Sequence, residues 1–125
     1  MATEPAEISD DDILFRRLAP DHLHPDGTVN SNAYKCGGKP DPEISVDLAK
    51  LTVESDAMAR AGRPGFRLGL LKVRDIRALG LTVRHSPTPE NPSHCVIEGS
   101  HSKTTCRQLA EITAAKIPPA ASDVL

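Results

Sequence analysis

The chain has 125 residues, the usual size of one domain, and its formal net charge of −2 is unlike the strongly basic balance of a dedicated nucleic-acid binder. With no tryptophan, one tyrosine and two phenylalanines, aliphatic side chains must supply nearly all of the buried core. No apolar run reaches the ~18 residues of a membrane-spanning helix, and three widely spaced cysteines are no disulfide framework, so we expect a cytoplasmic protein without a membrane association.

The first third of the chain combines polar segments with one apolar segment. Residues 1–12 are acidic and poor in apolar side chains, which predicts a disordered lead-in. Residues 13–18 have apolar side chains on both sides of Arg16 and Arg17, and their pattern fits either a short strand or one helical turn. Residues 20–42 are rich in proline, glycine, asparagine and aspartate, so we expect a long loop there.

The middle of the chain predicts a strand followed by a helix. Apolar and polar side chains alternate over residues 44–48, which indicates a half-buried strand with Ser45 and Asp47 on its polar face. The hydroxyl of Thr52 can cap the first turn of a helix, and Gly62 can end that helix in the left-handed conformation.

The remaining segments predict short elements joined by a proline linker. Residues 66–71, 81–84 and 95–97 have the pattern of strands, and residues 73–79 have helical spacing. The three prolines of residues 86–92 predict an extended, exposed connection.

A last helix is expected over residues 105–117, because Thr105 and Gln108 have the spacing of a capping box. We therefore predict an α+β domain over residues 13–117, with a mobile tail over residues 118–125. Its small mixed sheet has about four short strands, with two or three helices and long Pro/Gly-rich loops.

The layout of several short motifs resembles that of short bacterial proteins of unknown function. The segments that carry the resemblance are residues 14–17, 25–27, 29–31, 44–47 and 89–94. The resemblance implies a bacterial source and no particular activity.

Four polar residues are candidates for a catalytic pocket. Arg17, Ser31, Asp47 and His94 would have to converge in the folded chain to form a transferase or hydrolase site. His94 would act as a general acid or base beside a carboxylate, or would simply fix the linker through a loop carbonyl. An arginine on a first strand before a Ser/Asn segment resembles ADP-ribosyltransferase folds, but no glutamate completes that signature.

Thiol and imidazole groups allow two further hypotheses. His22, His24 and Cys36 are candidate zinc ligands on one loop, although the chain has no CxxC or HxxxH motif, and we expect no metal or other cofactor. Cys95 is a candidate nucleophile, but on a strand the side chain of His94 points to the opposite face, so a buried thiol is the alternative.

Residues 60–84 carry many cations and one acidic residue, Asp75. The candidate partner-binding residues of this stretch, which also contains Arg60 and Arg63, are Arg67, Lys72, Arg74, Arg77 and Arg84. Arginine forks suit phosphates or a partner's carboxylates, whereas single-stranded nucleic acids normally also need aromatic stacking, so nucleic acid is not favoured. The leading hypothesis is a small bacterial accessory protein that binds a protein partner through this basic face; an ordinary solvated surface, a small enzyme and a zinc module are the alternatives.

Overall fold

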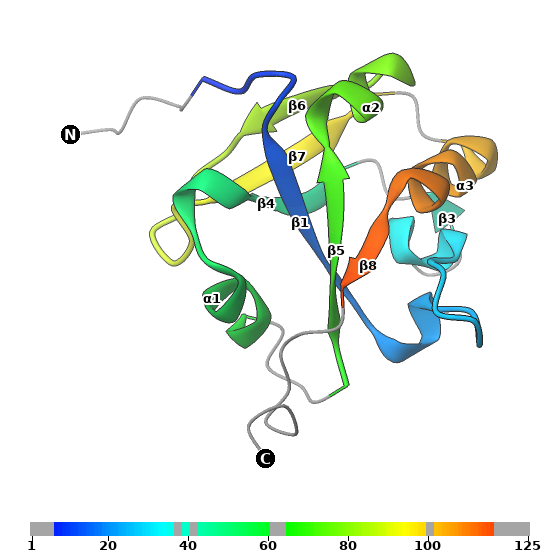
Figure 1. Cartoon of the computed structure of the whole chain (residues 1–125). Coiled ribbons are helices and arrows are strands. Elements are labelled where there is room, and N and C mark those ends of the chain that lie inside the picture. The colour runs from blue at the N-terminus through cyan, green and yellow to red at the C-terminus, as the bar shows by residue number, and fades with distance from the viewer. Residues whose placement is uncertain (1–6, 37–38, 41–42, 61–64, 100–101, 117–125) are drawn as a thin grey trace.

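One antiparallel sheet with helices on both faces organises the protein (Figure 1). The computed structural model describes residues 7–36, 39–40, 43–60, 65–99 and 102–116. Among these residues, the sheet has six strands in the order β6-β7-β4-β1-β5-β8. The strands of the main sheet are β1 (Ile13–Leu18), β4 (Glu43–Leu48), β5 (Arg67–Lys72), β6 (Thr82–His85), β7 (His94–Glu98) and β8 (Ala114–Lys116). The α-helices are α1 (Glu54–Ala59), α2 (Val73–Ala78) and α3 (Lys103–Ile112). The minor elements are the β2–β3 ribbon (Lys35–Cys36, Lys39–Pro40) and the 3-10 helices η1 (Pro20–His22), η2 (Ser31–Tyr34) and η3 (Ala49–Leu51).

The predicted α+β class is confirmed. The sheet is larger than expected, since both the 13–18 segment and the 114–116 segment join it. In the described residues, every pair of neighbouring strands in this sheet is antiparallel, whereas the sequence predicts a mixed sheet. The strand β1 lies between β4 and β5. No helix of the described residues has the length and apolar character to cross a membrane. Residues 1–6 and 117–125 lie outside the described residues, so the domain limits stay a prediction.

The larger core lies on the sheet face that α2, α3 and η2 cover. The strand residues of this core include Leu14, Leu18, Ile44, Val46, Leu48, Leu71, Cys95 and Ile97. Leu109 of α3 and Ile76 of α2 pack against them with no exposed surface. Because full burial of each large aliphatic side chain stabilises the fold by about 1.5–3 kcal/mol, this aromatic-poor core is sufficient for a domain of this size.

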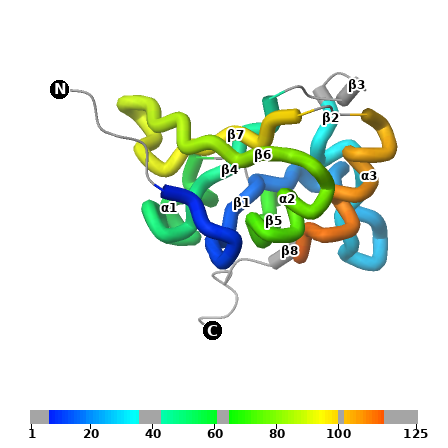
Figure 2. Tube along the Cα trace, turned by 90° about the horizontal axis from the view of Figure 1, so that it is seen from above, coloured from blue at the N-terminus to red at the C-terminus, as the bar shows by residue number. Residues whose placement is uncertain are grey.

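A smaller core lies on the opposite face, under α1. Phe15 of β1, Ala57 of α1 and Leu68 of β5 form it, and all three are buried. Figures 1 and 2 place α1 and α3 at opposite ends of the molecule. The polar residues discussed below share the α1 side of the sheet with this smaller core.

Arg16 and Arg17 point to opposite faces of the sheet, as neighbours on a strand must. The guanidinium of Arg16 donates to the carbonyl of Ala33 at 2.7 and 3.1 Å and to the carbonyl of Ser45 at 2.7 Å. It also lies 5.5 Å from the ring centroid of Tyr34. Arg16 therefore ties η2 to β4 and has a structural role.

The C-terminal helix is shorter than predicted. α3 ends at Ile112, and residues 114–116, which the sequence indicates as helical, form β8 against β5. The change occurs at Thr113, whose hydroxyl donates to the carbonyl of Leu109 at 2.6 Å. Since that proton is used, the hydroxyl of Tyr34 donates to Thr113 Oγ1 at 2.5 Å.

Two helix caps also differ from the prediction. Ser102 caps α3, because its hydroxyl accepts from the backbone N–H of Thr105 at 3.1 Å. Thr52 lies one residue before Val53, the N-cap position of α1, and its hydroxyl accepts from Arg60 Nη1 at 3.2 Å instead. Both errors are shifts of one to three residues along the chain.

Candidate functional site

Asp47 is the centre of a polar cluster on the α1 side of the sheet. Its side chain has no exposed surface, yet four neighbours approach its carboxylate. Arg17 Nη1 donates to Oδ2 at 2.6 Å, and Arg60 Nη1 lies 3.9 Å from the same oxygen. Asn91 Nδ2 donates to Oδ1 at 2.7 Å, and Ser93 Oγ lies 3.4 Å from that oxygen. The carboxylate is therefore paired on both oxygens, as a buried charge must be.

Three separate segments deliver these partners. The register of β1 against β4 pairs Phe15 with Asp47, so Arg17, two residues further, lies on the same face. Arg60 follows the last turn of α1. Asn91 belongs to the proline linker, which turns back through two hydrogen bonds of 3.1 Å between the backbones of Thr88 and Asn91.

The linker is thus less exposed than the sequence indicates. Ser93 has no exposed surface, and only 9% of the surface of Asn91 is exposed, although three prolines predict an exposed, extended connection. The two side chains fold inward because the carboxylate of Asp47 and each other's polar atoms satisfy them: Ser93 Oγ donates to Asn91 Oδ1 at 2.6 Å.

His94 lies next to this cluster. Its Cα is the antiparallel partner of the Asp47 Cα in the β4–β7 ladder. The Nδ1 atom of His94 lies 2.8 Å from the carbonyl of Ser86, and Nε2 lies 3.2 Å from Ser45 Oγ. The structure therefore brings Arg17, Asp47 and His94 to one sheet face and adds Ser45 to them.

Ser31 does not join the predicted pocket. It lies on η2, which covers the larger core on the other side of the sheet, and it lines a separate surface hollow with Arg107 and Glu111. The four candidates therefore do not converge on one cavity. The hydroxyl beside His94 belongs to Ser45, which the strand alternation of residues 44–48 had placed on the same face as Asp47.

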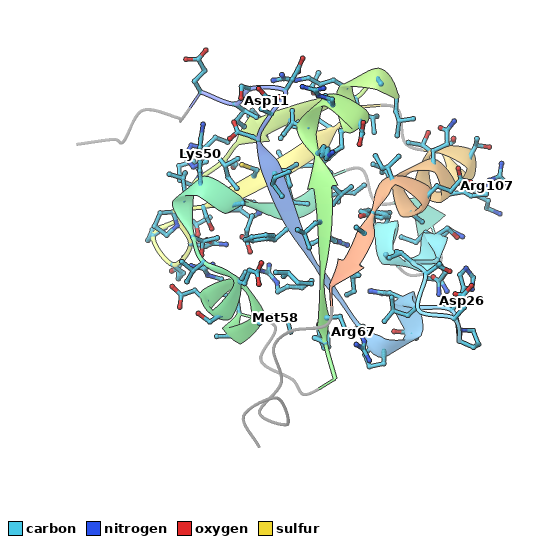
Figure 3. The ribbon with its side chains drawn as sticks, viewed as in Figure 1. Asp11, Asp26, Lys50, Met58, Arg67 and Arg107 are labelled. Atoms are coloured by element: carbon cyan, nitrogen blue, oxygen red, sulfur yellow. The ribbon has the colours of Figure 1, made fainter. Side chains whose placement is uncertain are left out.

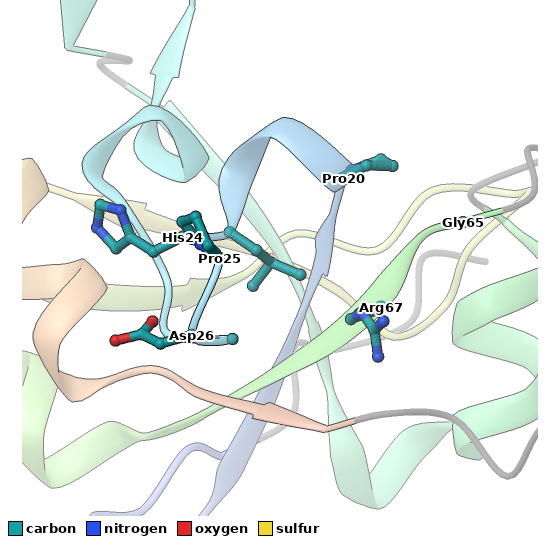
Figure 4. Close-up of a pocket in the computed structure, with 8 residues that line it drawn as sticks. Pro20, His24, Pro25, Asp26, Gly65 and Arg67 are labelled. Carbon is teal, nitrogen blue, oxygen red and sulfur yellow. The ribbon is translucent and has the colours of Figure 1, made fainter.

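Two wide-open hollows flank the loop of residues 24–28. Their volumes are about 720 and 830 Å³, and His24, Asp26 and Gly27 line both. Figure 4 shows His24 and Asp26 on one side of the first hollow and Arg67 on the other. Two hydrogen bonds from Thr28 lower the pKa of the Asp26 carboxyl, so this loop carries a fixed negative charge. Neither hollow is lined by Arg17, Asp47 or His94.

The zinc ligand set is not assembled in the described part of the chain. His22 Nδ1 accepts from the backbone N–H of Ala19 at 3.0 Å, and burial lowers the pKa of His22. His24 is exposed on the hollow, and the Cys36 side chain lies outside the described residues. Within those residues, no group of three or more His, Cys, Asp or Glu side chains has the arrangement of a metal site.

The predicted basic face is divided among different surfaces. Lys72 and Arg67 lie at opposite ends of β5. Arg84 donates to both carboxylate oxygens of Glu98, at 3.0 and 3.1 Å, and this pairing lowers the pKa of Glu98. Arg74 and Arg77 lie together on α2, and Lys72 immediately precedes that helix.

An acidic segment with a turn at Asp10 and Asp11 lies along the exposed arginines of α2. Arg74 Nη2 is 2.6 Å from Asp11 Oδ1, and Arg77 Nη1 is 2.6 Å from Asp10 Oδ1. Arg77 Nη2 also donates to the carbonyl of Ile8 at 2.8 Å. Figure 3 shows Asp11 beside α2, far from Arg67 at the other end of β5. Residues 8–12 of the predicted disordered lead-in therefore contact the basic surface directly.

Backbone contacts fix the same segment. The N–H groups of Val73 and Arg74 donate to the carbonyls of Asp12 and Asp10 at 3.0 and 3.2 Å. Lys50, on the neighbouring η3, places its Nζ atom 3.1 Å from Asp12 Oδ2. We call residues 8–12 the acidic segment and Lys72, Arg74 and Arg77 the α2 surface.

Cys95 is a buried thiol, as its strand position predicts. Burial, and then the nearby Asp47 carboxylate, raise its pKa to about 11. It has no exposed surface and packs in the larger core with Ile97, whereas His94 points to the other face. A thiol in this state is a poor nucleophile near neutral pH.

Searches against protein-family models, curated proteins and solved structures found no match to this chain.

Proposed function

We propose that this chain is a small bacterial accessory protein that binds an acidic segment of a protein partner, held in a turn, on the α2 surface. One observation carries the proposal: the chain's own acidic segment already lies along the side chains of Arg74 and Arg77. The surface therefore has the shape and charge that such a ligand requires.

The contacts define what a partner segment needs. Two carboxylates, at consecutive positions like Asp10 and Asp11, engage the two guanidinium groups. Carbonyls at alternate positions accept from the backbone N–H groups of Val73 and Arg74. These groups describe an acidic peptide in a turn, because the backbone N–H of Asp12 donates to the carbonyl of Ser9 at 3.1 Å and places the two carboxylates between them.

The acidic segment is exchangeable on energetic grounds. Its ion pairs are exposed. The fraction of side-chain surface open to solvent is 85% for Asp11, 60% for Asp10 and 58% for Arg74. Exposed pairs contribute roughly 0–1 kcal/mol each and weaken with salt. A partner segment with more carboxylates can therefore displace the internal one, which acts as a competitor for the same arginines.

The proposed setting is the bacterial cytoplasm. The odd number of cysteines and the burial of the Cys95 thiol support a reducing compartment. The acidic segment also explains how an exposed arginine pair avoids nonspecific association before the partner is present.

A peptide-binding experiment tests the proposal. The probe is a fluorescent peptide with the sequence of residues 6–12, measured by anisotropy at low salt with full-length protein. The double variant D10N/D11N loses the internal competitor, and we expect it to bind the probe about 3- to 10-fold more tightly than wild type, since two exposed ion pairs are removed. Arg107→Glu, on exposed α3, is the matched charge-reversal control and should leave binding unchanged.

The arginine variants give the decisive comparison. Introducing Arg74→Glu and Arg77→Glu into D10N/D11N should abolish the gain in affinity, and 0.5 M salt should do the same. Equal binding by wild type, D10N/D11N and the arginine variant would show that the α2 surface does not recognise acidic peptides.

A further inference from the structure

The hydroxyl of Ser45 and the imidazole of His94 form a donor–acceptor pair on the α1 side of the sheet. Strand alternation puts Ser45 and Asp47 on this face of β4, and the ladder to β7 places His94 opposite Asp47. Both Ser45 and His94 are partly exposed, while the carboxylate beside them is fully buried. A small molecule can therefore reach the pair but not Asp47.

The hydrogen bonds fix the proton positions in neutral His94. The carbonyl of Ser86, 2.8 Å from Nδ1, can only accept, so Nδ1 carries the ring proton. Nε2 is then an acceptor, and the hydroxyl of Ser45 donates to it across 3.2 Å. This is the arrangement of a serine nucleophile with a histidine base, in which the backbone carbonyl orients the ring.

A cationic edge lies next to the pair. Arg17 and Arg60 both approach the single carboxylate of Asp47, which leaves one positive charge in excess. The exposed fractions of the Arg17 and Arg60 side chains are 23% and 28%, so each guanidinium has an edge toward solvent. Guanidinium groups held in this way bind carboxylates and phosphates well.

We propose that Ser45 and His94 are the catalytic residues of an esterase-type site for small esters that carry an anionic group. Arg17 and Arg60 bind the anionic group, and Asp47 is a positioning residue that holds the two guanidiniums. This activity does not involve Arg74 or Arg77, since α2 covers the other face of the sheet.

The chemistry needs only the ester and water. Ser45 Oγ forms a bond to the acyl carbon while its proton moves to His94 Nε2, and the alcohol leaves with that proton as the ester C–O bond breaks. Water then attacks the acyl-serine and gives a proton to His94. The acid product leaves as the bond to Ser45 Oγ breaks, and that oxygen takes the proton back.

A fluorophosphonate probe tests the nucleophile directly. Its reaction joins phosphorus to Ser45 Oγ with loss of fluoride, and the hydroxyl proton goes to His94. We expect one adduct per wild-type chain, located on Ser45 by peptide mapping and absent from Ser45→Ala. His94→Gln should slow labelling about 100-fold or more, as loss of a general base does. Ser31→Ala, far from the pair, is the matched control and should label like wild type.

Because the wild-type adduct identifies the residue by itself, the result does not depend on a variant folding. The proposal is overturned if wild type forms no adduct, if the adduct is on another residue, or if His94→Gln labels at the wild-type rate.

A pair of esters tests the cationic edge. Nitrophenyl acetate is neutral, and the nitrophenyl monoester of succinate carries a free carboxylate. We expect wild type to prefer the succinate ester at least 10-fold in kcat/KM, and Arg60→Ala to lose that preference. An equal kcat/KM for both esters in wild type would remove the anionic group from the proposed substrate class.

Discussion

A carboxylate without any exposed surface destabilises a fold unless donors surround it, and Asp47 shows how this chain meets that demand. Arg17 supplies the charge at 2.6 Å, and Asn91 supplies a neutral donor at 2.7 Å. The strand that carries Asp47 is thus tied to β1 and to the linker by one side chain. The cluster has a structural role in addition to the chemistry proposed for its exposed edge.

Asp47→Asn should destabilise the protein strongly. The amide carries no charge to neutralise Arg17. Its NH2 group would also have to face one of the two donors, Arg17 Nη1 or Asn91 Nδ2, that now bind the carboxylate. We expect a loss of about 3 kcal/mol in the free energy of unfolding, the lower end for a broken buried pair because Arg17 is partly exposed. Urea unfolding measures it, with exposed Asp56→Asn as the control that should change by less than about 0.5 kcal/mol. A small loss for Asp47→Asn would mean that the linker relaxes to let water reach the cluster.

At the scale of elements, the junction of β5 with the end of α3 leaves no room for a side chain at Gly69. A Cβ there would lie 2.7 Å from Thr113 Cγ2 and 3.0 Å from Leu18 Cδ1. The same Thr113 accepts the hydrogen bond from Tyr34 and marks the end of α3. The close approach of strand and helix therefore requires glycine on one side and a hydroxyl on the other.

Gly69→Ala should lower the free energy of unfolding by about 1–3 kcal/mol, as overpacking does in a filled core. Thr113→Ser removes the clashing methyl group and keeps the hydroxyl that Tyr34 and Leu109 use. The double variant should therefore recover part of the loss, giving a coupling energy measurable by thermal or urea unfolding. Strictly additive losses would place the strain elsewhere, for example at the carbonyl of Arg16, 3.3 Å away.

At the scale of the whole molecule, two titratable groups in the core link stability to alkaline pH. Burial raises the pKa of Cys95 from 9.0 to about 11 and the pKa of Tyr34 from 10.0 to about 12. In both cases the unfolded chain loses its proton first. The stability that each group contributes is therefore complete below its unfolded pKa and declines as the pH rises toward its folded pKa.

We expect the free energy of unfolding to fall from pH 9 to pH 12, with Cys95 acting between 9 and 11 and Tyr34 between 10 and 12. The slope is at most about 1.4 kcal/mol per pH unit for each group. Urea unfolding at a series of pH values measures it. Cys95→Ala should remove the early part of the slope and Tyr34→Phe the later part, whatever their effect at neutral pH. Unchanged slopes in both variants would assign the pH dependence to other groups.

The sequence predicts local facts well and long-range partners poorly. The alternation of residues 44–48 correctly places Ser45 and Asp47 on one face, and the position of Cys95 on a strand correctly separates it from His94. Both inferences depend only on the period of a strand. Side-chain periodicity carries no information on which distant segment covers each face.

The misplaced residues show this limit. The sequence groups Ser31 with Asp47 because both are polar, but the loop that carries Ser31 crosses to the other face of the sheet. Asn91 does not stand out in the sequence, because three prolines predict an exposed linker, whereas in the structure its side chain turns inward. The sequence predicts a helix where β8 lies, because these three residues gain strand geometry only from pairing with β5.

The position of β1 has a consequence for how the protein folds during synthesis. Phe15 pairs with Asp47 on one side and with Leu70 on the other, so the central strand is made first and finds both neighbours later. One edge of β1 stays unpaired until β4, which ends at residue 48, has left the ribosome, and the other until β5, which ends at residue 72, has followed. Sheets closed by such distant pairings fold in roughly milliseconds to seconds rather than microseconds. For a nascent chain of this kind, the most vulnerable interval is the one before β4 and β5 emerge.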